Sequence, residues 1–222
     1  MPEGSTRLDL VIFDCDGVLV DSEVLSAKMM VEELALHGHG VDEAFVYEHF
    51  LGRSVATETR MLAELGWALP EGFFVDLQAR LLERFRAELR PVPGIAAVLA
   101  ALRTPRCVAS SSVPARIRLS LEITGLLPYL EPHLFSSTMV ERGKPFPDLF
   151  LHAAQAMGAE PERCLVIEDS EAGVQAARAA GMRVLGFTGA GHAAPAGLTP
   201  KLRAAGAEPV LASMEEVGAY LG

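Results

Sequence analysis

Two aspartates one residue apart, Asp14 and Asp16, follow a short apolar run and precede Gly17. The run at 10–13 is rich in β-branched and aromatic side chains and is bounded by turn residues, which is typical of a buried strand. Both carboxylates then lie at the carboxyl end of that strand, where open α/β sheets bind ligands. Carboxylates held this close repel each other unless a cation or a shared proton relieves them. The pair therefore predicts an aspartyl nucleophile, an acid/base partner and a metal ion, against the alternative of a solvated acidic turn.

Three further polar clusters follow segments that we predict as strands. They are Ser110/Ser111 after 106–109, Lys144 in a loop after 133–136, and Glu168/Asp169 at the end of 164–167. Because parallel strands present their carboxyl ends at one edge of a sheet, we expect all four clusters to share that edge. One cluster alone would be weak evidence, but their common placement indicates a single site.

These residue types suit phosphoryl transfer through a carboxylate. Asp14 is the expected nucleophile, and Asp16 could protonate the leaving oxygen and then deprotonate the attacking water. Mg²⁺ prefers hard oxygen ligands, so we expect Asp14, Asp169 and Glu168 to hold it together with the backbone carbonyl of Asp16. Converging acidic groups without a cation would be strongly destabilising, which makes the acidity itself an indication of the ion.

The cationic and hydroxyl clusters would stabilise the phosphate. Lys144 lies in a loop with two following prolines, which favour extended backbone, and it would neutralise charge on nucleophile and phosphate. Ser110 and the N–H groups of Ser111 and Ser112 precede a helix starting near Pro114, a geometry that binds anions. The alternatives are a solvated lysine turn, an ordinary serine cap and, at 168–170, an acidic helix cap.

The elements that must position these residues form two groups. Segments alternating between strand and helix patterns occupy 1–20 and 90–222 and predict an α/β, Rossmann-like, three-layer core with a parallel sheet. Between them, 21–89 shows only helical periodicity broken by glycines, which predicts a small inserted helical bundle. The predicted helices of the insertion are 23–37, 42–52, 54–66 and a fourth that follows Pro70 and runs through 73–85. Those of the core are 94–102, 114–124, 148–157, 173–180, one between the two last strands, and 214–221; these strands are 183–187 and 209–211.

Composition restricts the class of protein. The chain has 222 residues, of which 50% are hydrophobic and 22% charged, so it is long enough for a large core and intrinsic disorder is disfavoured. A formal net charge of -10 argues against nucleic acid and anionic membranes as partners. No apolar stretch reaches the about 20 residues of a membrane helix, and 1–6 lacks a signal-peptide core.

Cysteine and histidine usage adds little chemistry. The three cysteines are an odd number without metal-type spacing, each within or beside an apolar run, so we expect small buried hydrophobic residues. Carboxylates on both sides of Cys15 oppose a reactive thiolate. The six histidines show no convincing ligand pattern, and none is assigned a catalytic role. We expect a cytoplasmic monomer.

The chain resembles the haloacid dehalogenase superfamily of phosphohydrolases over nearly its whole length, through segments 14–22, 108–111, 143–145 and 166–170. The resemblance implies that Asp14 is the nucleophile and Asp16 the acid/base. It further implies a phosphate-stabilising role for Ser110 and Lys144, and metal binding at Glu168 and Asp169. The insertion at 21–89 is similar to the family's type-1 cap.

Within that superfamily the chain is most similar to bacterial sugar-phosphate phosphatases, including those acting on 6-phosphogluconate, and to β-phosphoglucomutase-like proteins. Dehalogenases lack the second aspartate, so Asp16 disfavours dehalogenation. The mutases carry a histidine and a lysine where this chain has Ser26 and Val113, which favours a phosphatase for a small phosphosugar. A phosphosugar mutase and a phospho-accepting receiver-type module are the alternatives. The cap would select the substrate, with Arg53 and Glu23 as candidate contacts.

Overall fold

The computed structural model describes residues 8–50 and 55–222, and within them the strands form one parallel sheet of six. The order of its strands is β3-β2-β1-β4-β5-β6. After β1 the chain adds β2 and β3 on one side of β1, and then returns to add β4, β5 and β6 on the other side. The boundary between β1 and β4 is the topological switch at which doubly wound sheets bind ligands. The strands are β1 (Leu10–Phe13), β2 (Arg106–Ser110), β3 (Leu134–Ser136), β4 (Cys164–Glu168), β5 (Arg183–Phe187) and β6 (Val210–Leu211).

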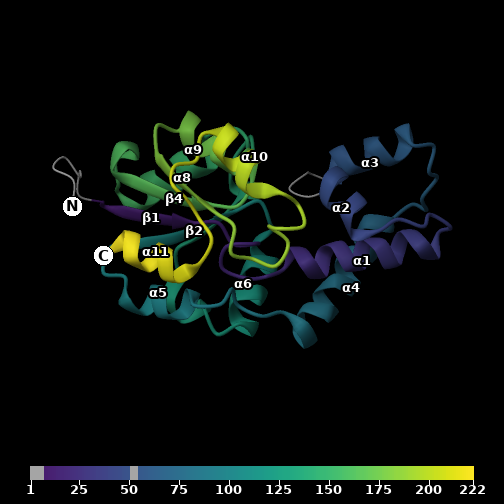
Figure 1. The fold of residues 1–222 in the computed structure, drawn as a ribbon, viewed down its shortest axis with the longest axis horizontal. Helices are drawn as coiled ribbons and strands as arrows, with labels where there is room; N and C mark the ends of the chain where they lie inside the picture. The colour runs from purple at the N-terminus through teal and green to yellow at the C-terminus, as the bar shows by residue number, and fades with distance from the viewer. Residues whose placement is uncertain (1–7, 51–54) are drawn as a thin grey trace.

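Helices cover both faces of the sheet and give the core three layers (Figure 1). One face carries α8, α9 and α10, and the other carries α5, α6 and α11. These helices are α5 (Ile95–Ala101), α6 (Pro114–Ile123), α8 (Asp148–Met157), α9 (Glu171–Ala179), α10 (Leu198–Ala205) and α11 (Met214–Leu221). A single short turn of helix, α7 (Leu127–Leu130), precedes β3. The expected α/β Rossmann-like core is confirmed.

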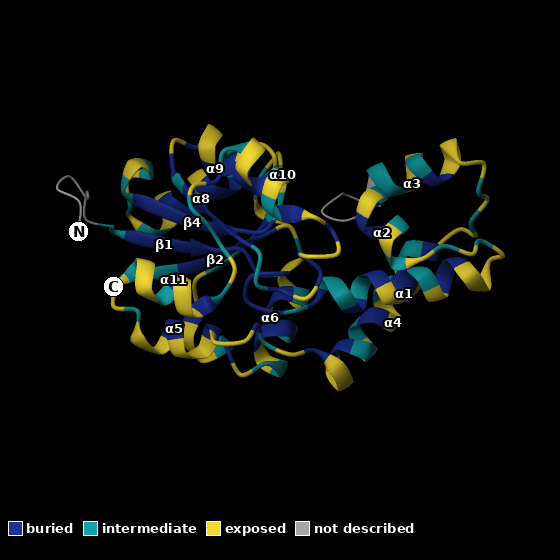
Figure 2. Ribbon diagram, viewed as in Figure 1, coloured by how far each residue is buried: buried dark blue, intermediate teal, exposed yellow. Residues whose placement is uncertain are grey.

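The central strands are apolar on both faces because both faces are covered. All four residues of β1 are fully buried, as are nearly all of β4 (Figure 2). Such strands appear as continuous apolar runs rather than as alternating patterns. The three cysteines are free thiols buried in this core, as the sequence predicts.

Four helices form a separate layer beyond the carboxyl ends of the strands (Figure 1). They are α1 (Glu23–Leu36), α2 (Glu43–His49), α3 (Val55–Glu64) and α4 (Phe73–Glu88). Helices α1 and α4 pack along each other, and the ion pairs Arg80–Glu33 (2.5 Å) and Arg84–Glu32 (2.8 Å) join them. Arg80 and Arg84 of α4 thus help to hold the bundle together.

The chain passes between the core and this bundle at two adjacent points. Val20 forms a β-bridge with Pro91. On either side of it, Asp21 N–H donates to the Arg90 carbonyl and Val92 N–H donates to the Leu19 carbonyl, both at 3.0 Å. The bundle is therefore tethered by one paired crossing directly after the Asp14–Asp16 turn. In the described part of the chain no helix is both long and apolar enough to span a membrane.

Candidate active site

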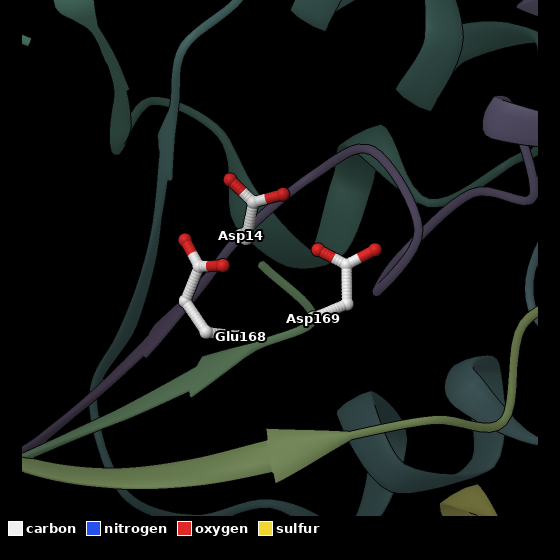
Figure 3. A group of neighbouring side chains, drawn as sticks. All are labelled: Asp14, Glu168 and Asp169. Atoms are coloured by element: carbon white, nitrogen blue, oxygen red, sulfur yellow. The ribbon is translucent and has the colours of Figure 1, made fainter. Parts of the chain in front are cut away.

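Three buried carboxylates meet where β1 and β4 end (Figure 3). Asp14 follows β1 directly, Glu168 is the last residue of the neighbouring β4, and Asp169 follows it. The two strands are paired, with Phe13 opposite Ile167. One oxygen atom from each of the three carboxylates lies within 4.8 Å of the other two. The expected convergence of the first and last acidic clusters is therefore present in the fold.

Lys144 reaches this acidic group from the loop before α8. Its Nζ lies 2.5 Å from Asp14 Oδ1 and 2.5 Å from Glu168 Oε1, and it donates to the Ala109 carbonyl at 3.0 Å. The side chain is only 4% exposed. Burial opposes the charge, but the two carboxylates raise the pKa of Lys144 above its usual value, so the lysine stays cationic.

Glu168 uses both of its carboxylate oxygens. Oε1 accepts from Lys144, while Oε2 accepts from the Ser170 N–H (3.1 Å) and the Ser170 hydroxyl (2.9 Å). Ser170 in turn accepts the Gly173 N–H and caps α9. The alternative of a helix cap at 168–170 is thus correct for Ser170, and Glu168 holds both this turn and Lys144 in place.

The electrostatics of the cluster call for a further cation. Burial raises the pKa of Asp14 well above its usual value; Lys144 opposes this rise, and Glu168 and Asp169 add to it. Three carboxylates meet one lysine, so an excess of negative charge remains at the site. Clustered hard oxygen donors of this kind fit Mg²⁺, which would favour the ionised form of Asp14.

His192 supplies a contact that sequence reasoning missed. The histidine belongs to the loop after β5, is 1% exposed, and places Nε2 3.1 Å from Asp169 Oδ2. Burial opposes protonation, but Asp169 raises the pKa of His192 above its usual value. Gly17, at φ +79°, is the third partner: a Cβ there would lie 1.8 Å from Asp169 Oδ2 and 2.8 Å from His192. No spacing in the sequence connects these three positions.

Asp16 lies apart from the three-carboxylate group and has its own set of donors. Its carboxylate accepts from Ser22 Oγ (2.6 Å), Ser112 Oγ (2.7 Å) and Arg116 Nη2 (2.9 Å). Burial raises its pKa, but Arg116 and the two hydroxyls outweigh burial and hold the pKa of Asp16 below its usual value. The Asp16 side chain thus already has three donors and lies outside the three-carboxylate group, so it is not itself placed to bind the expected metal ion.

The serines after β2 form the turn into α6. Ser110 is buried, and its hydroxyl accepts the Ser112 N–H at 3.0 Å, so this N–H, expected to bind phosphate, already has a partner. Ser111 is exposed and its carbonyl accepts from Ser137 Oγ. Helix α6 begins at Pro114, as predicted.

Of the two candidate substrate contacts, Arg53 and Glu23, the structure describes only Glu23. Arg53 lies outside the described residues. Glu23 begins α1 and lines a cavity of about 60 Å³ together with Ser26, Tyr47 and Glu58. Burial, and after it the nearby Asp16, raises the pKa of Glu23 to about 7. The small cavity in the bundle is therefore lined by apolar side chains, such as Met30 and Phe50, together with a few polar ones.

Comparison with known proteins places this site in a family context. Residues 8–181 match the haloacid dehalogenase-like hydrolases. The chain is 33% identical over 192 residues to a 6-phosphogluconate phosphatase of Escherichia coli, covering 86% of this chain and 87% of that protein. It is also 32% identical to Hexitol phosphatase A of Escherichia coli, over 93% and 91% of the two chains.

Solved structures agree with these matches. A haloacid dehalogenase-like protein of unknown function from Agrobacterium tumefaciens superposes with a TM-score of 0.87 at 37% identity, over 96% of this chain and 97% of that one. A family hydrolase from Deinococcus radiodurans, solved with bound phosphate and sodium, gives a TM-score of 0.82 at 36% identity, over 97% and 95%.

Proposed function

The chain belongs to the haloacid dehalogenase-like hydrolase family and is a phosphoric monoester hydrolase; we propose that it releases phosphate from a phosphosugar or sugar-acid phosphate with the aid of Mg²⁺, through a phosphate ester formed on Asp14. The observation that carries the proposal is the convergence of Asp14, Lys144, Glu168 and Asp169 at the topological switch of the sheet. Phosphatase names among its relatives, and phosphate in a structural neighbour, support the same chemistry.

The chain's own residues account for both halves of the reaction. The Asp14 carboxylate attacks phosphorus, the bond to the sugar oxygen breaks, and Asp16 gives that oxygen a proton. Asp16, now ionised, takes a proton from water, and the resulting hydroxide attacks phosphorus and frees Asp14 and inorganic phosphate. Lys144 neutralises charge beside the nucleophile throughout.

Mg²⁺ would be held by Asp14, Asp169 and the backbone carbonyl of Asp16. Glu168 would bind the ion directly or through a water molecule. When bound, the ion would neutralise negative charge on the carboxylates and on the phosphate oxygens. Ser110 and Ser111, at the turn before α6, are our candidates for contact with the remaining phosphate oxygens.

The bundle at 21–89 would act as a cap that encloses the rest of the substrate. Its paired tether beside the Asp14–Asp16 turn supports this role, because a small movement there displaces the bundle over the site. The cavity lined by Glu23 and Tyr47 offers hydroxyl and carboxyl groups to a polyol, and Arg53 stays a candidate anion contact.

A panel of phosphorylated metabolites, assayed for inorganic phosphate with Mg²⁺ and with a chelator, tests the proposal. The panel includes 6-phosphogluconate, fructose 1-phosphate and hexitol phosphates. We expect multiple turnovers that require Mg²⁺. Isomerisation primed by a sugar bisphosphate would instead indicate a mutase, and a lasting phosphoprotein without turnover would indicate a receiver-type module.

Asp14→Asn tests the nucleophile directly. This variant should lose turnover while keeping its fold, and retained multiple-turnover release would contradict the assignment. Asp9→Asn is the matched control, because Asp9 precedes the same strand at its opposite end and pairs with Arg163 at 2.7 Å. The control should turn over at the wild-type rate.

A further inference from the structure

Arg116 is a buried arginine of α6 whose charge faces Asp16. Its side chain is 12% exposed, and its Nη2 lies 2.9 Å from Asp16 Oδ1. Ser22 Oγ shares that oxygen, and Ser112 Oγ donates to Oδ2. Removing one partner of a buried charge pair typically costs several kcal/mol, so each charge strongly constrains the other's position.

These three donors come from different parts of the fold. Ser22 lies just before α1 of the bundle, Ser112 in the turn after β2, and Arg116 on the first half of α6. Both oxygens of Asp16 are therefore occupied, and all its partners donate. The carboxylate is held in one orientation by these donors. One carboxylate oxygen must release a donor and take up a proton before Asp16 can protonate a leaving group.

Arg116 also contacts the bundle. Its guanidinium carbon lies 5.1 Å from the ring centroid of Phe85, a fully buried residue of α4. A cation over an aromatic face is attracted to the ring, most strongly where water is excluded. One side chain thus connects the acid/base of the core to the last helix of the bundle, so movement of α4 acts on the partner of Asp16.

We propose that Arg116 is a positioning residue that sets the orientation of Asp16 and links that orientation to helix α4 of the cap. This inference rests on the proposed phosphatase function and deepens it. Arg116 acts through Asp16, and the double contact with Asp16 and Phe85 is the geometry that assigns it this role.

Two substitutions at Arg116 test the role, with a control on the same helix. Arg116→Met keeps the packing on Phe85 and removes the charge, whereas Arg116→Lys keeps the charge. Arg118→Met is the control, because Arg118 is half exposed and pairs with Glu131 on the surface. All variants are first compared by thermal unfolding to show that they fold.

Steady-state kinetics on the best sugar phosphate supply the first readout. For Arg116→Met we expect kcat to fall about 10- to 100-fold, because the variant loses part of the rate enhancement that general acid–base catalysis provides. KM should stay within about threefold of wild type. Arg116→Lys should recover most of the lost kcat, and Arg118→Met should match wild type. An unchanged kcat in Arg116→Met, or equal losses in both Arg116 variants, would overturn the proposal.

A leaving group that needs no proton separates positioning from general damage. With p-nitrophenyl phosphate, Arg116→Met should give a first burst of nitrophenolate at about the wild-type rate, followed by slow turnover, because water attack still needs Asp16. If the burst rate fell by the same factor as the turnover rate, the positioning role assigned to Arg116 would be refuted.

Crystal structures of the same variants give a readout independent of activity. In Arg116→Met the Asp16 carboxylate should leave its positions beside Ser22 and Ser112, and in Arg118→Met it should stay. An unmoved Asp16 in Arg116→Met contradicts the inference. If the wild-type protein released phosphate from no ester, the proposed function would fail, while this structural comparison would still decide whether Arg116 orients Asp16.

Discussion

Replacing Lys144 by methionine removes the cation that three buried carboxylates face. Lys144 is 4% exposed and lies 2.5 Å from both Asp14 and Glu168. Methionine fills similar volume, so the main change is the loss of charge. The remaining carboxylates are then buried beside one another without their partner, and they must either take up protons or repel.

The size of the effect follows from this geometry. Breaking a buried ion pair by removing one partner costs about 3–5 kcal/mol. For a chain of this size each kcal/mol lowers Tm by about 2–4 °C, so Lys144→Met should lose about 6–20 °C in a metal chelator. Saturating Mg²⁺ should raise Tm more in the variant than in wild type, because the more negative site binds the ion more tightly.

Thermal unfolding followed by circular dichroism at pH 7.5, in chelator and in Mg²⁺, measures both effects. Lys201→Met is the control, since Lys201 is exposed on α10. A Tm in chelator within about 2 °C of wild type would refute the reasoning that Lys144 carries the charge balance of the site. An equal Mg²⁺ shift in variant and wild type would show that the ion does not bind among these carboxylates.

Three further substitutions test neighbouring parts of the site. Gly173→Ala places a Cβ 1.9 Å from the Glu168 carboxyl carbon, so it should lower the free energy of unfolding in urea by about 1–3 kcal/mol. Gly218→Ala is the control, because its Cβ would lie 3.5 Å from its nearest neighbour, and it should unfold like wild type. Glu23, with a pKa raised to about 7, becomes charged above that pH and then repels an anionic substrate, so the wild-type KM should rise between pH 6 and 8 more than that of Glu23→Gln. Parallel KM profiles would exclude the residue from the substrate pocket. His192→Leu removes the partner of Asp169, a carboxylate of the proposed metal site, and should weaken Mg²⁺ binding about 10- to 100-fold by calorimetry. An unchanged affinity would show that His192 does not support that site.

The sequence predicted the helices and strands of the core closely because their signals are local. Buried strands such as 164–168 appear as apolar runs, and helices such as 148–157 begin and end at prolines and glycines. The short α7 was missed, since a single turn of four residues is too short to show helical periodicity. The position of the acidic clusters after parallel strands was equally predictable, because that edge follows from topology alone.

Side-chain partnerships at the site were not predictable in the same way. Lys144 could be assigned to the site only by its motif, and the structure adds that it bridges Asp14 and Glu168. His192, which showed no convincing partner in the sequence, lies against Asp169 from a loop that follows another strand. Arg116 contacts Asp16 across a separation of 100 residues.

By itself, then, the amino-acid order determined which segments are strands and helices and which chemical groups end them, because hydrophobic periodicity and turn residues act over a few positions. Only the tertiary structure decided which charge meets which, that Asp16 is held by Arg116 and that Asp169 contacts His192. Such pairs depend on how α6 and the loop after β5 pack against the sheet, and that packing is set by the whole buried core rather than by any local stretch.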